Sequence, residues 1–226
     1  MSTVVLCGSL GSTAAMWEPQ LPVLADRDVL VVEHPGHGAA PVVDVAGVAG
    51  LAARTLKQVG DERFAFVGLS LGGAIGMQLA LDVPEQVEKL VLACTSARFG
   101  NPQQWLDRAA TVRGDGLEAI VDVVLARWFV GRPEPRWREM LLSVEPEGYA
   151  RCCEALAAWD ARDALARIGA PTLAIAGEAD PSTPPAYLRE LADRIPGARL
   201  EVLQDAAHLA NIERADEFNR LLEEWL

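Results

Sequence analysis

The chain is poor in the residues that mark several classes of protein. Its 226 residues include only four cysteines, Cys7, Cys94, Cys152 and Cys153, and none has the spacing of a metal or redox site. We expect reduced, buried thiols. Basic residues are also scarce, since 20 Lys and Arg against 32 Asp and Glu leave a formal charge of -12. This balance argues against nucleic acid or an anionic membrane as a partner.

Long hydrophobic runs are absent as well. No apolar segment reaches the roughly 18 residues that a membrane-spanning helix needs. The N-terminal sequence MSTVVLCGSLGS lacks the basic region of a signal peptide, which predicts a cytoplasmic protein. Because half of the residues are hydrophobic, a chain of this length can form one domain with a substantial core.

The sequence does contain an alternation of short apolar runs and amphipathic segments. The runs predict six strands, at residues 4–7, 29–32, 64–67, 90–93, 172–176 and 199–203. Helices are expected between and after them, at residues 47–58, 73–82, 185–194 and 215–226. Because the runs are almost continuously apolar, the strands should be mostly parallel and covered on both faces, as in an α/β fold.

The alternation is interrupted between residues 99 and 169. This stretch has about four amphipathic segments and no clear strand. Four of the six tryptophans lie in it, namely Trp105, Trp128, Trp137 and Trp159. We predict a core made of residues 1–98 and 170–226. Residues 99–169 should form a helical cap over the carboxyl edge of the sheet, where open α/β sheets bind ligands.

A serine between glycines joins the third predicted strand to the helix after it. The sequence Gly68-Leu69-Ser70-Leu71-Gly72 has the G-x-S-x-G pattern in the strand–turn–helix context of a nucleophile elbow. The glycines permit a sharp, strained turn, and the helix that follows points its positive N-terminus at the same place. Ser70 is therefore the predicted nucleophile, and a plain glycine turn is the alternative.

A serine hydroxyl needs a base to activate it, and the base needs an acid to orient it. The chain has three histidines: His34 and His37 lie in the glycine turn EHPGHG, and His208 follows the last strand. After a nucleophile elbow the chain order is Ser, acid, His, which favours His208 as the base. A solvent-facing loop histidine is the alternative for His208. The EHPGHG pair lacks the carboxylate cluster of a metal site, so we expect no metal.

The acid should follow the fifth predicted strand, in the sequence IAGEADPSTPP. Asp180 is favoured over Glu178, and Asp205 is a weaker rival; a turn-capping role is the alternative for Asp180. The developing oxyanion needs two backbone N–H groups. Leu71, directly after the nucleophile, and Leu10, in the loop after the first strand, are the expected donors.

Several peptides along the chain occur in a recognisable order. They are GSLGSTAAMWEPQ, GHG, GLSLGGAIGMQLA, SARFGNPQQW, RWF, PEGYARCCEALAAWD, PTLAIAGEADPSTPP and AHLANIE. From about residue 4 to its end, the chain thereby resembles the α/β-hydrolase superfamily and, within it, the 3-oxoadipate enol-lactonases of the β-ketoadipate pathway. The resemblance implies an acyl-serine intermediate and no cofactor. It also implies that Ser70, Asp180 and His208 are the triad and that Leu10 and Leu71 are the oxyanion donors.

The chain departs from this family in two places. Family members begin with a β-hairpin for which this sequence has no residues, so we expect about six strands with residues 29–32 at an edge. An apolar edge strand invites pairing, so this edge should be covered or form a homodimer contact. Pro35 stands where the family usually has an arginine.

The lactone that the resemblance implies is a small anion, and its acetate arm needs a cation. The arginines considered for this role are Arg98, Arg127, Arg132, Arg136, Arg138 and Arg151. Arg127 is favoured because the sequence ARWF ends an amphipathic helix that could face the site. Trp128 and Trp105 are the expected walls of the pocket. Solvated surface arginines and tryptophans buried in the cap are the alternatives.

The same fold supports other functions. A carboxylesterase, another lactonase or a C–C bond hydrolase would share the triad, and a non-catalytic ligand receptor would lack turnover.

Overall fold

The computed structural model describes residues 3–226; residues 1 and 2, with which the predicted core range begins, lie outside the described residues. Six strands form one all-parallel sheet in the order β2-β1-β3-β4-β5-β6. They are β1 (Thr3–Cys7), β2 (Val29–Val32), β3 (Phe64–Leu69), β4 (Val87–Ala93), β5 (Thr172–Gly177) and β6 (Arg199–Leu203). The six predicted strands and the α/β class are confirmed.

Strand β4 begins three residues earlier than its apolar run indicates. Val87 pairs with Phe64 and Lys89 with Ala65 at the start of β3, with a register shift between the two pairs. The side chains of Glu88 and Lys89 are only partly buried, so this end of the strand carries polar residues. Pairing with the neighbouring strand therefore extends β4 beyond its hydrophobic part.

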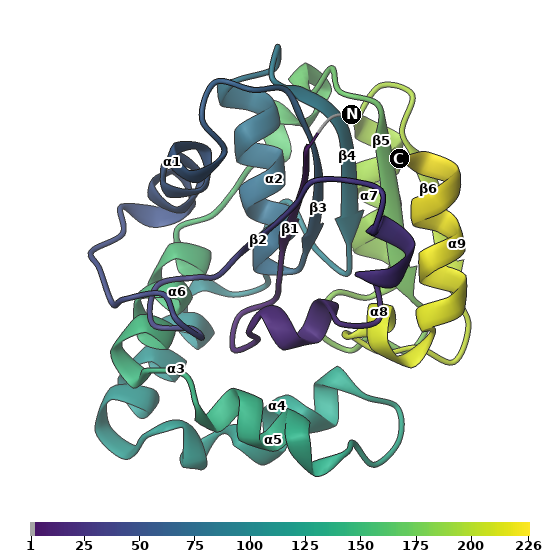
Figure 1. Cartoon of the computed structure of the whole chain (residues 1–226). Coiled ribbons are helices and arrows are strands. Elements are labelled where there is room, and N and C mark those ends of the chain that lie inside the picture. Colours follow the sequence, from purple (N-terminus) through teal and green to yellow (C-terminus); the bar gives the residue numbers. More distant parts are fainter. Residues whose placement is uncertain (1–2) are drawn as a thin grey trace.

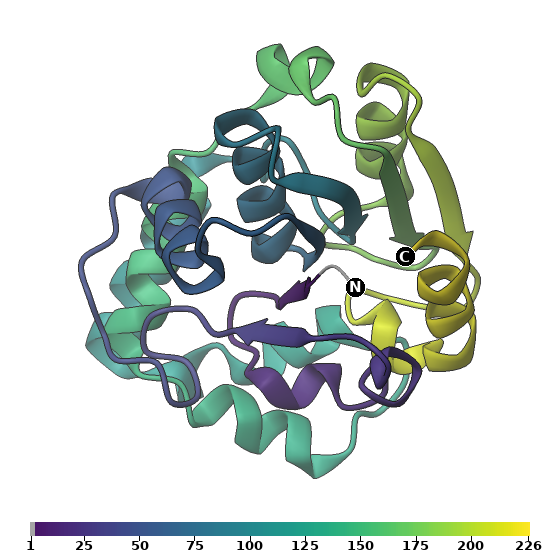
Figure 2. The ribbon, with the colours of Figure 1, turned by 45° about the horizontal axis from the view of Figure 1, so that its top comes forward.

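The helices cover both faces of the sheet. The α-helices are α1 (Gly47–Val59), α2 (Leu71–Asp82), α3 (Pro102–Asp115), α4 (Val121–Trp128), α5 (Pro135–Leu142), α6 (Pro146–Ala157), α7 (Pro185–Arg194), α8 (Ala210–Glu213) and α9 (Ala215–Trp225). The 3-10 helices are η1 (Ala14–Trp17), η2 (Pro22–Leu24), η3 (Leu117–Ala119) and η4 (Arg162–Arg167). Helices α1, α2 and α7 lie on one face, and η1, η2 and α9 lie on the other (Figures 1 and 2).

This division of the helices follows from the strand order. The chain runs from β1 outward to β2 and then returns across the sheet to β6. Because crossovers between parallel strands are right-handed, the outward and returning connections lie on opposite faces. On the face of the sheet that η1, η2 and α9 cover, the ring of Trp17 packs against that of Phe218 in α9, with 6.4 Å between ring centroids.

Helix α2 is the central helix of the fold and fixes the position of its own first turn. It packs against β1, β3 and β4 and is covered by α1. Its residues from Leu71 to Met77 are all buried, as are all six residues of β3. The turn between β3 and α2, which contains Ser70, is therefore held between two fully buried elements.

The parallel sheet gathers several loops at one edge. All six strands end at the same side, so the loops after β1, β3, β5 and β6 meet there. Helices α3 to α6 lie below the strand arrowheads at this side (Figure 1). Residues 99–169 contain the helices α3, η3, α4, α5, α6 and η4 and no strand. We propose these residues as the cap.

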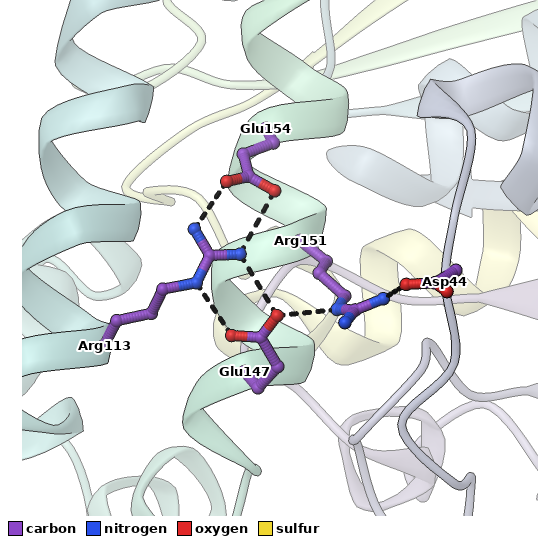
Figure 3. Close-up of polar contacts among 5 residues, drawn as sticks. All are labelled: Asp44, Arg113, Glu147, Arg151 and Glu154. Atoms are coloured by element: carbon purple, nitrogen blue, oxygen red, sulfur yellow. Dashed lines mark hydrogen bonds and ion pairs between the residues drawn. The ribbon is translucent and has the colours of Figure 1, made fainter.

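Charged side chains tie two helices of the cap to each other and to the loop before α1 (Figure 3). Arg113 on α3 donates hydrogen bonds to Glu147 and Glu154 on α6. Arg151 on α6 also pairs with Glu147, and it reaches Asp44. We refer to these five residues as the cap ion-pair network.

Replacing Arg113 with alanine should lower the melting temperature slightly. Exposed ion pairs are each worth at most about 1 kcal/mol, which corresponds to roughly 2–4 °C for a chain of this size. The hydrogen bond from Arg113 holds the pKa of Glu147 below its usual value. The contribution of Glu147 should therefore be present at neutral pH and decline as the pH falls through that lowered pKa.

The matched control for this prediction is Arg220→Ala, because the ion pair of Arg220 with Glu224 lies within α9. Thermal unfolding at low and high salt measures both variants. We expect the larger loss for Arg113→Ala at low salt and a smaller difference at high salt. Equal losses for the two variants would show that the network does not stabilise the cap.

Strand β2 lies at the edge of the sheet, as predicted. Val29, Leu30 and Val31 are half-buried, and Val32 is buried. The homodimer contact expected at this edge stays a prediction.

Candidate active site

Ser70 lies in a strained turn that two glycines make possible. Its backbone has φ 58° and ψ -114°, in a region that non-glycine residues rarely adopt. A Cβ atom on Gly68 would overlap the backbone of Gly72, and one on Gly72 would overlap the carbonyl of Cys7. Both glycines of the G-x-S-x-G pattern are therefore needed for the close approach of β1, β3 and α2.

Hydrogen bonds from the neighbouring strand hold this turn in place. The Ser70 N–H donates to the carbonyl of Ala93 at 2.9 Å, and Thr95 Oγ1 donates to the carbonyl of Ser70 at 2.7 Å. The strain at Ser70 is thus offset by anchoring on both sides of the residue. Within residues 3–226, the Ser70 side chain makes no capping hydrogen bond to α2, and it lines a pocket.

His208 and Asp180 meet at the carboxyl ends of β6 and β5. Because these strands are neighbours, the loops that follow them lie side by side. His208 Nδ1 lies 2.8 Å from Asp180 Oδ2, and both side chains are buried. A carboxylate only accepts, so Nδ1 donates to it and Nε2 is the ring nitrogen that this contact leaves free.

The Asp180 carboxylate accepts three more hydrogen bonds from its own loop. They come from the N–H groups of Ser182 and Thr183 and from Thr183 Oγ1, at 2.7, 3.1 and 2.6 Å. Burial by itself raises the pKa of Asp180, but His208 and these donors outweigh burial and leave the pKa below its usual value. Asp180 is therefore ionised at neutral pH.

The two rivals for the acid position lie elsewhere. Glu178 and Asp205 are both exposed, and Glu178 accepts a hydrogen bond from the Asp205 N–H. Neither makes a hydrogen bond with His208 in the described part of the chain. Thr183 was not predicted from the sequence. Its position three residues after Asp180, in an aspartate turn, is the signal that indicates it.

One pocket brings the predicted serine and histidine together beneath the cap. Its lining residues are Leu10, Ser70, Phe99, Trp105, Arg108, Val124, Arg127, Trp128, Tyr149, Ser182, Thr183 and His208. The pocket therefore contains residues from four loops of the core and from helices α3, α4 and α6. It includes all three residues that were predicted from the sequence to bind substrate.

The two predicted oxyanion donors have free N–H groups. Leu71 is the first residue of α2, so its N–H has no partner one turn earlier. Within residues 3–226, the N–H groups of Leu10 and Leu71 make no hydrogen bond outside regular helix and strand pairing. The next N–H of the helix, that of Gly72, donates to the carbonyl of Gly8 at 3.1 Å, which holds the Leu10 loop against α2.

Two arginines line the pocket without a carboxylate partner in the described residues, Arg127 on α4 and Arg108 on α3. The guanidinium carbon of Arg108 lies 4.9 Å from the centroid of the Trp105 ring. Arg108 was not considered in the sequence analysis. Its spacing of three residues from Trp105 on one helix was the available signal.

The other cap arginines considered from the sequence lie outside this pocket. Arg136, Arg138 and Arg151 form surface ion pairs with carboxylates. Arg98 and Arg132 do not line the pocket. Of the six arginines considered, only Arg127 lines the pocket that contains Ser70.

Some features of the described chain bear on other kinds of site. All four cysteines are free and buried, as predicted. Within residues 3–226, no group of three or more His, Cys, Asp or Glu side chains could hold a metal ion. No helix in this range has the length and apolar character needed to cross a bilayer.

The chain belongs to the alpha/beta hydrolase family, whose model matches residues 4–221. The resemblance inferred from the peptides is confirmed, and the protein is a hydrolase.

Within this family, the chain is similar to two enol-lactonases and to an esterase. The chain is 36% identical to 3-oxoadipate enol-lactonase 2 of Acinetobacter baylyi, over 97% of this chain and 86% of the relative. It is also 36% identical to an enol-lactonase from Burkholderia xenovorans of known crystal structure, with a TM-score of 0.92 over 99% of this chain and 90% of that one. A thermophilic esterase from Thermogutta terrifontis, solved with malate bound, is 27% identical with a TM-score of 0.92, over 100% and 89% of the two chains.

Proposed function

We propose that this protein opens 3-oxoadipate enol-lactone to 3-oxoadipate through an acyl-serine intermediate. The observation that carries the proposal is one pocket lined by Ser70, by His208 and by two arginines that have no carboxylate partner within residues 3–226. An acyl-transfer pair next to unpaired cations suits an ester that carries a carboxylate. The enol-lactonases among the relatives support this substrate. The reaction belongs to the β-ketoadipate pathway of aromatic catabolism and would take place in the cytoplasm.

In the first step, Ser70 Oγ attacks the lactone carbonyl and passes its proton to His208 Nε2. Asp180 accepts from Nδ1, so it holds the imidazole in the tautomer that leaves Nε2 able to accept the proton. The carbonyl oxygen becomes an oxyanion, and the N–H groups of Leu10 and Leu71 stabilise it. Ser70 and His208 line the same pocket, and the hydrogen bond between Ser70 Oγ and Nε2 would form in the substrate complex, where catalytic hydrogen bonds commonly tighten.

In the second step, the ring C–O bond breaks. The leaving oxygen departs as an enolate and takes the proton from His208, and the resulting enol tautomerises to the ketone. Water then attacks the acyl-serine, with His208 as base again, and the Ser70 hydroxyl is regenerated. Ring opening and hydrolysis together give a single product, a keto dicarboxylic acid, and no cofactor takes part.

The substrate carboxylate is held by the arginines of the cap. Arg127 and Arg108 come from different helices and reach the same pocket, which lets one or both grip the acetate arm. Trp105 and Trp128 form apolar walls for the ring. The negative net charge of the chain makes these local cations necessary for an anionic substrate.

We expect Arg127→Ala and Arg108→Ala to raise KM for the enol-lactone. A charge-assisted hydrogen bond is worth about 1.5–3 kcal/mol, so each loss should cost roughly tenfold or more. A neutral aryl ester lacks the carboxylate and should lose little. Steady-state kinetics with both substrates measures this contrast.

The matched control is Arg132→Ala, which removes an exposed cap arginine outside the pocket. If KM rose equally for the anionic and the neutral substrate, the arginines would not recognise the substrate carboxylate. A wild-type preference for the neutral ester would instead indicate a carboxylesterase. Cleavage of a C–C bond in product analysis would indicate the third class of hydrolase, and tight binding without turnover would indicate a receptor.

Replacing Thr183 with valine should slow turnover with little change in KM. The hydroxyl of Thr183 donates to the same Asp180 oxygen that contacts His208. Its loss costs a hydrogen bond to a charged group, about 1.5–3 kcal/mol, so kcat should fall about tenfold or more.

Thr183→Ser keeps the hydroxyl and serves as the control. Its kcat should stay near that of wild type. A serine variant as slow as the valine variant would assign the effect to packing rather than to the hydrogen bond.

A further inference from the structure

The two histidines of the EHPGHG turn contact the loop that carries Leu10. Both side chains are buried, with 2% of His34 and none of His37 exposed. His34 Nε2 lies 2.9 Å from the carbonyl of Gly8, and the Gly11 N–H lies 3.0 Å from His37 Nε2. The two contacts therefore bracket Leu10 in the sequence.

These contacts define which ring nitrogens carry protons. His37 Nδ1 lies 3.0 Å from the carbonyl of Pro35, which can only accept, so Nδ1 donates. The Gly11 N–H can only donate, so His37 Nε2 accepts and is unprotonated. His34 Nε2 donates to Gly8 by the same reasoning. Burial, together with the neighbouring His34, lowers the pKa of His37 to about 3, so the ring is neutral at ordinary pH.

The turn that carries His37 is itself fixed to the cap. The Glu145 N–H donates to the carbonyl of Gly36 at 2.8 Å, just before α6. Gly148 approaches Pro35 so closely that a Cβ atom would overlap the Pro35 carbonyl. The Tyr149 ring, which lines the pocket, stacks on His37 at an interplanar angle of 15°. Contacts thus run from α6 through the turn to Gly11.

The Leu10 loop has few other anchors. Residues 8–10 belong to no helix or strand; the Gly72 N–H of α2 donates to the carbonyl of Gly8, and within the loop the N–H and Oγ of Ser12 donate to the carbonyl of Ser9. On its far side the loop is held by the bond from Gly11 to His37. An oxyanion donor must be placed within about 0.5 Å to be effective, so the position of the Leu10 N–H depends on the contacts that hold Gly8 and Gly11.

We propose that His37, assisted by His34, is a positioning residue that aims the Leu10 N–H at the oxyanion. The inference rests on the proposed function only in so far as the protein hydrolyses an ester through Ser70. Any ester substrate therefore tests it. His37 is buried and does not line the pocket, so its effect passes through Gly11 to Leu10.

The test compares His37→Phe with His37→Gln. Phenylalanine keeps a ring against Tyr149 but removes the acceptor for Gly11, whereas the glutamine amide oxygen can replace Nε2. We expect His37→Phe to lower kcat for a neutral aryl ester about 10- to 100-fold with little change in KM, because small misplacements of catalytic groups cost this much. His37→Gln should recover most of the loss.

A second measurement reports on the oxyanion donors themselves. A thionoester develops its charge on sulfur, which accepts hydrogen bonds poorly, so wild type should strongly prefer the ordinary ester. The ratio of the two kcat/KM values should fall towards one in His37→Phe. Leu24→Ala, a core variant in η2, controls for lower stability and should leave the ratio unchanged.

An unchanged ratio in His37→Phe, with activity lost only in proportion to unfolded protein, would overturn the inference and make His37 a purely structural residue. Failure of wild type to open the enol-lactone, with aryl ester turnover intact, would overturn the proposed function alone. Absence of all ester hydrolysis in wild type would overturn both.

Discussion

Ser70→Ala should reduce enol-lactone turnover by about 10⁴- to 10⁶-fold in kcat, because the members of a triad act as a unit. Alanine removes only the hydroxyl oxygen and can be held by the same hydrogen bonds at its N–H and carbonyl as Ser70. The variant should therefore fold and still bind substrate. Loss of enol-lactone absorbance measures the rate, and equilibrium binding of the product measures the intact pocket.

Ser143→Ala is the matched control, since Ser143 follows α5 and lies outside the pocket. Its kcat should equal that of wild type. A Ser70→Ala variant that is correctly folded and retains a tenth of wild-type activity would contradict the acyl-serine route.

Asp180→Asn should lower kcat by about 10⁴-fold, as expected for a triad whose histidine is held in the wrong tautomer. The asparagine amide can donate to His208 Nδ1, which moves the imidazole proton to Nε2. That nitrogen then cannot accept the Ser70 proton. Because the pKa of Asp180 lies below its usual value, the wild-type carboxylate is ionised throughout the neutral range and the defect should persist there.

Asp205→Asn provides the matched control. Asp205 adopts a positive φ of 53°, which asparagine also tolerates, and its side chain is exposed. Its activity should be unchanged. The double variant Ser70→Ala, Asp180→Asn should be no slower than Ser70→Ala alone. Additive losses would show that the two residues act independently and not as a triad.

The strands and the serine turn could be predicted because their signals are local. The apolar runs of β1, β3 and β5 are buried on both faces, so their sequences are almost continuously hydrophobic. In folds with a nucleophile elbow the triad follows the chain order Ser, acid, His, and this order selects Asp180 and His208 as partners of Ser70. The adjacent parallel strands β5 and β6 bring Asp180 and His208 together. These inferences need only strand order and loop position.

The residues that were missed depend on tertiary packing. Arg108 reaches the pocket because α3 packs against α6, and no local pattern fixes that orientation. Thr183 becomes relevant through a hydrogen bond to a carboxylate whose position depends on His208. His37 was interpreted as part of a glycine turn, since its partner Gly11 lies 26 residues away.

Labelling with a fluorophosphonate tests the central claim most directly, because this reagent phosphonylates an activated serine. We predict one phosphonyl group per chain, located by peptide mass spectrometry on Ser70, with enol-lactone hydrolysis lost in proportion to labelling and no adduct on Ser70→Ala. Full enol-lactone turnover by protein completely labelled at Ser70, or equal inactivation through another residue, would contradict the account.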